Sequence, residues 1–265
     1  SMLILACGAT IAQKTILSGY APGAERRQMT ITTYDDLISM REIPLAEGLV
    51  DSTGRFRFEL EVKEIIRIIL AIDFHKAEMF LEPGKAYDIS IDPIYYEDYT
   101  EVNPFIQSQN LTLRFPDEEN TELNIAVGQF NALFSGFLMS NFNALYRDRN
   151  RVVLDTFRVN VNREFDGYTH PYFLDYVRYN LASLEQLTRY YSPARIGYLY
   201  FTKGPVLYNN LEYMEFFNNY FTKYLTASSE ELRRLDYHAL MKTPDPYQSL
   251  MKTMAADSKI GRAHV

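Results

Sequence analysis

The period of the hydrophobic pattern changes near Pro93, and this change constrains the fold more than any other feature of the sequence. Before it, apolar and charged residues alternate, as in the segment 55–60, RFRFEL. After it, apolar residues recur every three or four positions, as in the segment 170–191, HPYFLDYVRYNLASLEQLTRYY. A period of two indicates a half-buried strand, and a period of 3.6 indicates an amphipathic helix. The sequence therefore predicts an α+β chain, with an antiparallel β-sandwich-like domain over residues 14–95 and a mainly α-helical domain over residues 96–259.

Turn residues separate the strand-like runs of the first domain. The segments Asp51–Gly54 (DSTG) and Glu82–Lys85 (EPGK) combine the residue types that favour tight turns. The run 64–72, EIIRIILAI, is apolar almost throughout, which favours a central strand, although its pattern also allows a short helix. Short strands at regular spacing, with no helices between them, favour a β-sandwich or an open barrel.

Aromatic residues are unusually frequent, with 21 Tyr and 17 Phe. The densest group lies in the segment 209–225, where helical spacing predicts a row of core residues and a second contact row beside it. The core row is Leu211, Met214, Phe217, Phe221 and Leu225, and the second row is Phe216, Tyr220 and Tyr224. Asn209 is the predicted N-cap of this helix. Because helical spacing accounts for both rows, a packed core is the favoured interpretation, and a ligand groove lined by aromatic rings is the alternative.

Charge and hydropathy exclude two classes of partner. The net charge is −7, and no block of clustered Lys and Arg interrupts it. Nucleic-acid binding needs such clusters to meet the phosphates, so no nucleic acid is expected. No run approaches the roughly 20 apolar residues that a helix needs to cross a bilayer, so no transmembrane span is expected.

No pattern in the chain indicates a reaction. His75, His170 and His238 lie far apart in sequence, and none has a second ligand at a known metal-binding spacing. The nucleophile motif G-x-S-x-G and the glycine-rich phosphate loops are absent from the sequence. No residue is therefore assigned to catalysis, to a cofactor or to a metal.

The first residues indicate export. The run MLILACGATIAQ is apolar and then turns to small residues, with Thr10 and Ala12 placed as the −3 and −1 positions of a cleavage site. Residues 1–13 are therefore interpreted as the tail of a signal peptide, which places the protein in the periplasm or cell envelope. Cys7 could instead be the lipidated cysteine of a lipoprotein box, and a buried first strand is the third interpretation. With one cysteine at most, the mature chain holds no internal disulfide and no Cys-x-x-Cys pair.

The last residues resemble something other than protein-coding sequence. Residues 260–265, IGRAHV, are similar to the translation of a common sequencing adapter. They are expected to be a non-native tail, with the last natural residue near Lys259. The chain is thus interpreted as a fragment of a longer protein.

Several segments between Lys14 and Leu225 resemble one family. The most distinctive are 80–89, FLEPGKAYDI, and 205–221, PVLYNNLEYMEFFNNYF. The layout is similar to the N-terminal and middle regions of envelope TlpA-like disulfide reductases, which have a thioredoxin fold. The resemblance implies that a catalytic thioredoxin-like domain with a Cys-x-x-Cys pair comes last, and this chain ends before any such motif. No catalytic residue is therefore transferred to a position in this sequence.

The sequence leaves three functional hypotheses. The first is an accessory, non-catalytic region of an exported thiol-disulfide oxidoreductase, which positions the missing thioredoxin-like domain or an envelope partner protein. The second is an envelope module that binds a glycan or a peptide in an aromatic groove. The third is a structural or assembly protein of the envelope. Under the first, the fragment is no enzyme by itself, whereas its full-length parent reacts by thiol–disulfide exchange.

Overall fold

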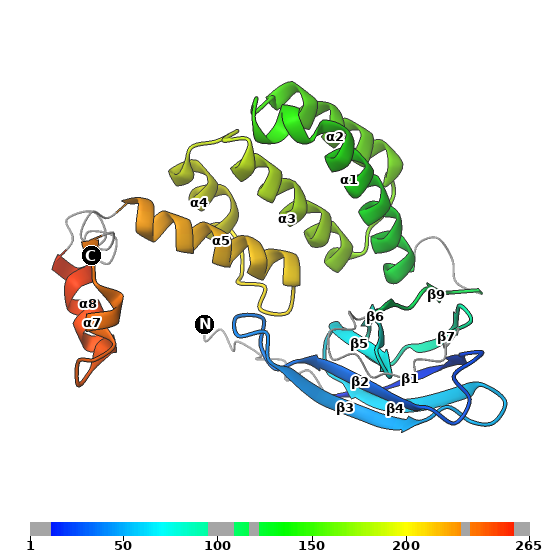
Figure 1. Ribbon diagram of the computed structural model, residues 1–265. Coiled ribbons are helices and arrows are strands. Elements are labelled where there is room, and N and C mark those ends of the chain that lie inside the picture. Colours follow the sequence, from blue (N-terminus) through cyan, green and yellow to red (C-terminus); the bar gives the residue numbers. More distant parts are fainter. Residues whose placement is uncertain (1–11, 95–108, 117–121, 229–233, 257–265) are drawn as a thin grey trace, which may run out of the picture.

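A computed structural model describes residues 12–94, 109–116, 122–228 and 234–256, and it confirms the predicted α+β class. Strands come first and helices follow, with the helices on one side of the sheets (Figure 1). The strands are β1 (Gln13–Tyr20), β2 (Gln28–Tyr34), β3 (Glu42–Leu49), β4 (Arg55–Val62), β5 (Ile66–Ile72), β6 (His75–Leu81), β7 (Ala86–Ile91), β8 (Gln109–Asn110) and β9 (Leu113–Arg114). The run EIIRIILAI contains the strand β5, so the strand prediction is confirmed over the helical alternative.

The strands form two sheets that pack face to face. One sheet has the order β4-β1-β7-β9 and the other has the order β3-β2-β5-β6-β8. Neighbouring strands run antiparallel except in the pairs β1–β7 and β6–β8, which are parallel. The first strand therefore lies in the interior of its sheet, between β4 and β7, and not at an edge.

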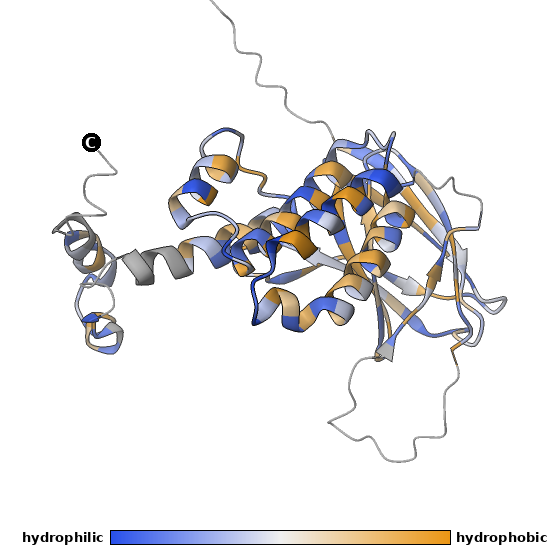
Figure 2. Cartoon of the chain, turned by 90° about the horizontal axis from the view of Figure 1, so that it is seen from above, coloured by the Kyte–Doolittle hydropathy of each residue, from blue (hydrophilic) through white to orange (hydrophobic). Residues whose placement is uncertain are grey.

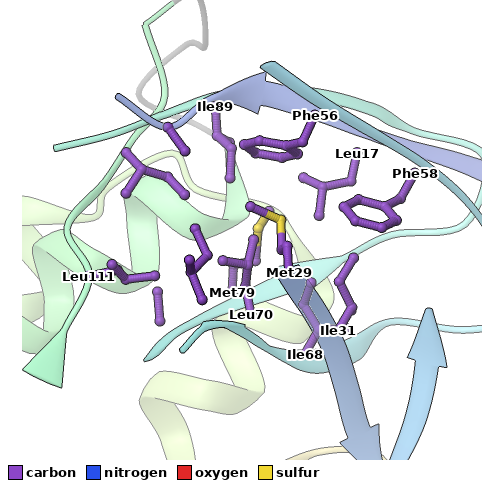
Figure 3. Close-up of a cluster of buried hydrophobic side chains, with 14 of the residues drawn as sticks. Leu17, Met29, Ile31, Phe56, Phe58, Ile68, Leu70, Met79, Ile89 and Leu111 are labelled. Atoms are coloured by element: carbon purple, nitrogen blue, oxygen red, sulfur yellow. The ribbon is translucent and has the colours of Figure 1, made fainter. Parts of the chain in front are cut away.

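Alternate residues of each strand fill the space between the two sheets. Figure 3 shows Leu17, Phe56 and Phe58 of one sheet pointing toward Met29 and Leu70 of the other. All five are less than 9% exposed. Burying an aliphatic or aromatic side chain of this size contributes about 1.5–3 kcal/mol, so this layer provides much of the stability of the β domain.

One glycine is required where β1 and β7 pair. A methyl group added at Gly19 would lie 2.1 Å from the carbonyl oxygen of Ile89 and 2.8 Å from the Phe56 ring. Real side-chain carbons do not approach a backbone atom that closely. Any larger residue at this position would therefore push β1 and β7 apart.

Two short strands from beyond residue 95 complete the sheets. β8 pairs with β6, and β9 pairs with β7. The β domain thus extends to about Pro116, beyond the predicted boundary at residue 95. The alternation of Leu111, Leu113 and Phe115 was the signal for this extension, but the run is too short for its period to be recognised.

The helices that follow are α1 (Leu123–Tyr146), α2 (Arg151–Glu164), α3 (Pro171–Leu187), α4 (Pro193–Phe201), α5 (Leu211–Ser228), α7 (Tyr237–Leu240) and α8 (Pro246–Ala256). α3 contacts α1, α2 and α5, so it is the centre of the helical domain. Hydrophobic and hydrophilic residues alternate around these helices, as amphipathic packing requires (Figure 2). α7 and α8 lie apart from the other helices in both overall views.

The buried side of the aromatic helix α5 matches the predicted core row at Leu211 and Met214 but departs from it further along the helix. Its buried residues are Leu211, Tyr213, Met214, Phe216 and Tyr220. Phe217 and Phe221, which the spacing places in the core, are only partly buried, and Phe216 is fully buried instead. The reason is that α5 packs against α3 and α4, and the Phe216 ring lies between Tyr200 and Phe201 of α4 and Tyr179 of α3. The side chains of Tyr224 and Leu225 lie outside the described residues.

Asn210, and not the predicted Asn209, caps α5. Its Oδ1 accepts a hydrogen bond of 2.9 Å from the N–H of Tyr213. Asn210 is 4% exposed, so this cap is part of the core. Two adjacent asparagines offer the same chemistry, and only the direction of chain entry selects between them.

Candidate functional site at the domain junction

The turn Glu82–Lys85 is where the β domain meets the helices. Gly84 has φ of +73°, a conformation that favours glycine, and this explains the EPGK sequence of the turn. The buried hydroxyl of Thr15 on β1 donates to the carbonyl oxygen of Glu82 at 2.9 Å and accepts from the N–H of Gly84 at 3.0 Å. The Thr15 side chain therefore fixes the turn to the strand β1.

A lysine of this turn links the two domains. The Lys85 Nζ lies 3.2 Å from Oε1 of Glu122, at the start of α1, and 3.4 Å from Oε1 of Glu82. The Glu122 side chain is only 1% exposed. Its other oxygen accepts hydrogen bonds from the N–H groups of Asn124 at 2.7 Å and Ile125 at 3.1 Å, so it is the N-cap of α1. A buried carboxylate that accepts from a helix N-terminus and faces a lysine is compensated by both.

Glu122 is not among the residues that the sequence predicts for this junction. Glutamate is not among the preferred N-cap residues, and this explains why the pattern gave no signal at Glu122.

The Asn124 side chain hydrogen-bonds both backbone groups of one residue of β6, as a neighbouring strand would. Its Oδ1 accepts from the N–H of Phe80 at 2.6 Å, and its Nδ2 donates to the carbonyl oxygen of Phe80 at 3.0 Å. The Phe80 ring meanwhile leaves the sheet and packs between the helices, with centroid distances of 5.2 Å to Tyr172 and 6.2 Å to Tyr176. One residue of β6 thus belongs to the helical core.

His170 joins the turn to a second helix. Its Nδ1 accepts from the N–H of Phe173 at 3.5 Å, at the start of α3, and its Nε2 lies 3.1 Å from Oε2 of Glu82. Because Nδ1 acts as an acceptor, the proton of the neutral ring is on Nε2, which donates to the carboxylate. We call the group of Glu82, Lys85, Glu122, Asn124 and His170 the junction brace.

Replacing Asn124 by leucine tests the brace. The change keeps the size of the side chain but leaves the Phe80 N–H and C=O without their partner. We expect a loss of about 1–3 kcal/mol in the free energy of unfolding, measured by urea denaturation, because unpaired buried backbone groups keep their full desolvation penalty. Asn143→Leu, at an exposed position of the same helix, is the control. An equal loss in the two variants would contradict the role of Asn124.

A cavity of about 280 Å³ lies beside the brace, between the five-stranded sheet and helices α1 and α3. Its polar lining includes Arg67 of β5, Glu78 of β6, Asn131 of α1 and Tyr176 of α3. Arg67 and Glu78 form an ion pair across neighbouring strands. No Ser, Cys or His is among the described residues that line the cavity, and its polar side chains offer hydrogen bonds and charge.

A hydrogen-bonded chain leads from α5 to this cavity. The Tyr176 hydroxyl donates to Oδ1 of Asn131 at 2.9 Å, and the Glu212 carboxyl hydrogen-bonds both Tyr176 and Asn180. Burial, together with the charge of Glu215, raises the pKa of Glu212 to about 7. The hydrogen bonds with Tyr176 and Asn180 lower the pKa of Glu212, but the effect of burial is larger and the pKa stays raised.

The fold does not bring His75, His170 and His238 together. His170 belongs to the brace, His75 lies on β6, and His238 lies on α7. In the described part of the chain, no group of three His, Cys, Asp or Glu side chains is placed to hold a metal ion. The described helices include none that is both long enough and apolar enough to cross a membrane.

Comparison with known proteins does not place the chain in a family. No family model matches it, and no curated protein matches it. Among solved structures, it is similar to a 9R-lipoxygenase from Cyanothece PCC8801, with a TM-score of 0.22 and 12% sequence identity. The match covers 64% of this chain and 30% of the lipoxygenase chain. So low a TM-score carries no argument about fold or activity.

Proposed function

We propose that this chain is the accessory, non-catalytic region of an exported thioredoxin-like thiol-disulfide oxidoreductase, and that it positions the catalytic domain. The junction brace carries this proposal. It joins the turn Glu82–Lys85 to the N-termini of α1 and α3 through side chains that are largely withdrawn from solvent. A platform for another domain needs such a junction, because a loose one would transmit no orientation.

The two segments that carry the family resemblance also support the proposal. Segment 80–89 supplies Phe80, Glu82 and Lys85 of the junction. Segment 205–221 supplies the buried aromatic side of α5. Segment 80–89 thus joins the β domain to the helices, and segment 205–221 holds α5 against α3 and α4.

The export part of the proposal is compatible with the β domain. β1 begins at Gln13, so cleavage before that residue would remove none of the strand. The protein would then act in the periplasm or envelope, where thiol–disulfide exchange is common.

The DNA downstream of the codon for Lys259 tests this function. We expect the reading frame to continue into a thioredoxin-like domain with a Cys-x-x-Cys pair. The longer protein should then reduce insulin in a turbidity assay, whereas the present chain should not. A stop codon soon after Lys259, or thiol-dependent activity in the present chain, would contradict the proposal, since exchange needs an accessible thiolate.

A binding module is the second candidate, and the polar cavity beside the brace favours it. Asn131 and Tyr176 present an amide and a phenol there, groups that can bind a sugar or a peptide backbone. A thermal-shift screen with neutral oligosaccharides and dipeptides tests this function. A ligand that stabilises the protein but fails to stabilise Asn131→Ala would favour the binding module over the accessory region.

A further inference from the structure

The ends of α1 and α3 form a groove that is distinct from the domain junction. Its volume is about 620 Å³, and its apolar lining includes Leu138, Phe142 and Tyr146 of α1 and Leu184 and Leu187 of α3. Phe142 is 59% exposed and Tyr146 is 61% exposed. Their rings stack on each other at a centroid distance of 5.3 Å. Two large exposed rings beside an apolar groove are unusual on a surface that nothing covers.

A kink in α1 builds one wall of the groove. Asn141 has φ of −122° and ψ of 16°, which is not helical, and its Nδ2 donates to the carbonyl oxygen of Phe137 at 3.0 Å. The last turn of the helix, with Phe142 and Tyr146, therefore follows a different direction from the rest. Leu138, Phe142 and Leu145 still recur at helical spacing and form a ridge along this wall.

Arginines supply all of the charge in the described lining of the groove. They are Arg149, after α1, and Arg189, after α3, and no carboxylate of the described residues lines the groove with them. The nearby Asp148 is paired with Arg147 at 3.0 Å. Because the whole chain has a net charge of −7, a groove with two arginines and no acid differs from the average surface.

Both arginines stand where glycine is the favoured residue. Arg149 and Arg189 each have φ of +51°, in the left-handed region, just after a helix ends. Glycine and asparagine are the usual residues at such a position, because a side chain is strained there. Arginine at both ends suggests that the guanidinium groups have a use beyond ending the helices.

We propose that this groove binds an amphipathic helix of a partner protein, one whose apolar side is flanked by carboxylates. Two neighbouring helices that expose an apolar channel are the arrangement into which a third helix packs. The arginines would then form charge-assisted hydrogen bonds with carboxylates at one end of that helix. This inference stands on the groove alone, and it does not depend on the proposed function.

The amphipathic helix α8 of this chain does not fit the groove by charge. Between Pro246 and Ala256 it carries Lys252 and no carboxylate. A second copy that offers α8 would therefore bring Lys252 toward the arginines, while the carboxylate of Asp245 is used to cap the helix through the N–H of Gln248. An acidic helix of a partner protein would supply the carboxylates that are absent from the described lining of the groove.

Two synthetic peptides provide the probe. Both are helical over about four turns with leucine along one side, and one has glutamate at the flanking positions where the other has lysine. We expect fluorescence anisotropy to show binding of the glutamate peptide at low salt, weaker binding at high salt, and no binding of the lysine peptide. Equal binding of both peptides, or of neither, would overturn the proposal.

The double variant Arg149→Gly, Arg189→Gly separates recognition from folding. Glycine accepts a positive φ without strain, so the variant should be at least as resistant to urea as the original protein. We expect its affinity for the glutamate peptide to fall about tenfold or more, since both guanidinium groups are lost. Unchanged affinity in a folded double variant would overturn the proposal.

Arg26→Gly is the matched control. Arg26 also has positive φ, at +64°, but it lies in the β domain and outside the groove. This variant should bind the glutamate peptide like the original protein.

If sedimentation velocity shows self-association that the double variant abolishes, the groove is instead an interface between copies. Binding to vesicles of phosphatidylcholine and phosphatidylglycerol, without binding to the peptide, would likewise overturn the proposal.

Discussion

Truncating Phe216 to alanine is expected to lower the free energy of unfolding by about 3–5 kcal/mol, the usual range for a buried phenylalanine. Phe216 is 0% exposed, and its ring contacts Tyr200 and Phe201 of α4 at a centroid distance of 5.3 Å each. Tyr179 of α3 lies 6.1 Å away on the other side. The truncation would leave a void among three rings. Because the rings belong to two different helices, they cannot all move inward to fill the void.

Phe217→Ala is the matched comparison, because the same residue type stands at the next position of the same helix. Phe217 is only partly buried, so water can replace part of the lost contact, and the loss should be clearly smaller. Urea denaturation of both variants measures the difference. A larger loss at Phe217 than at Phe216 would mean that α5 is rotated from the orientation described here.

Replacing Glu212 by glutamine is expected to make the protein more stable at pH 8 and to flatten its stability against pH. In the folded protein the pKa of Glu212 is about 7, raised from 4.5 by burial and by Glu215. Between these two values the folded state holds a proton that the unfolded state has released. The free energy of unfolding of the original protein therefore falls as pH rises from about 4.5 to 7, by on the order of 3 kcal/mol in total.

Glutamine is uncharged like the protonated carboxyl and does not titrate, so the variant should lack that fall. Its advantage over the original protein should be small near pH 4.5 and largest above pH 7. Urea denaturation at several pH values measures this difference. Glu215→Gln should lower the upper end of the pH range over which stability falls, because removing the neighbouring charge lowers the pKa of Glu212. A variant Glu212→Gln that loses stability with pH as the original does would refute the assignment.

The division into a β domain and a helical domain could be predicted from the sequence because it depends on local periodicity. The alternation in β4 and the apolar run in β5 both appear in the structure as expected. The side by which α5 faces the core could not be predicted in the same way. Phe216 and Phe217 are adjacent and identical, and which ring is buried depends on how α3 and α4 pack against α5.

The junction was beyond prediction for a related reason. Lys85 and Glu122 are 37 residues apart, and Glu82 and His170 are 88 residues apart. No local pattern connects such residues, and each of them alone resembles an ordinary surface residue. His170 illustrates this, since its cap at the start of α3 is local but its contact with Glu82 depends on tertiary structure.

The interior place of β1 has a consequence for the order in which this protein folds. The Ser18 hydroxyl on β1 donates to the carbonyl oxygen of Tyr87, 69 residues further along the chain. The first strand must therefore wait for β4 and β7 before its sheet can form, while the hairpins β2–β3 and β5–β6 close from neighbouring residues. Contacts over such a separation slow folding, because the loop must be closed before any pairing is gained. During synthesis, β1 is thus the segment that waits longest for a partner strand, and it is where a chaperone that binds extended chains would have the most time to act.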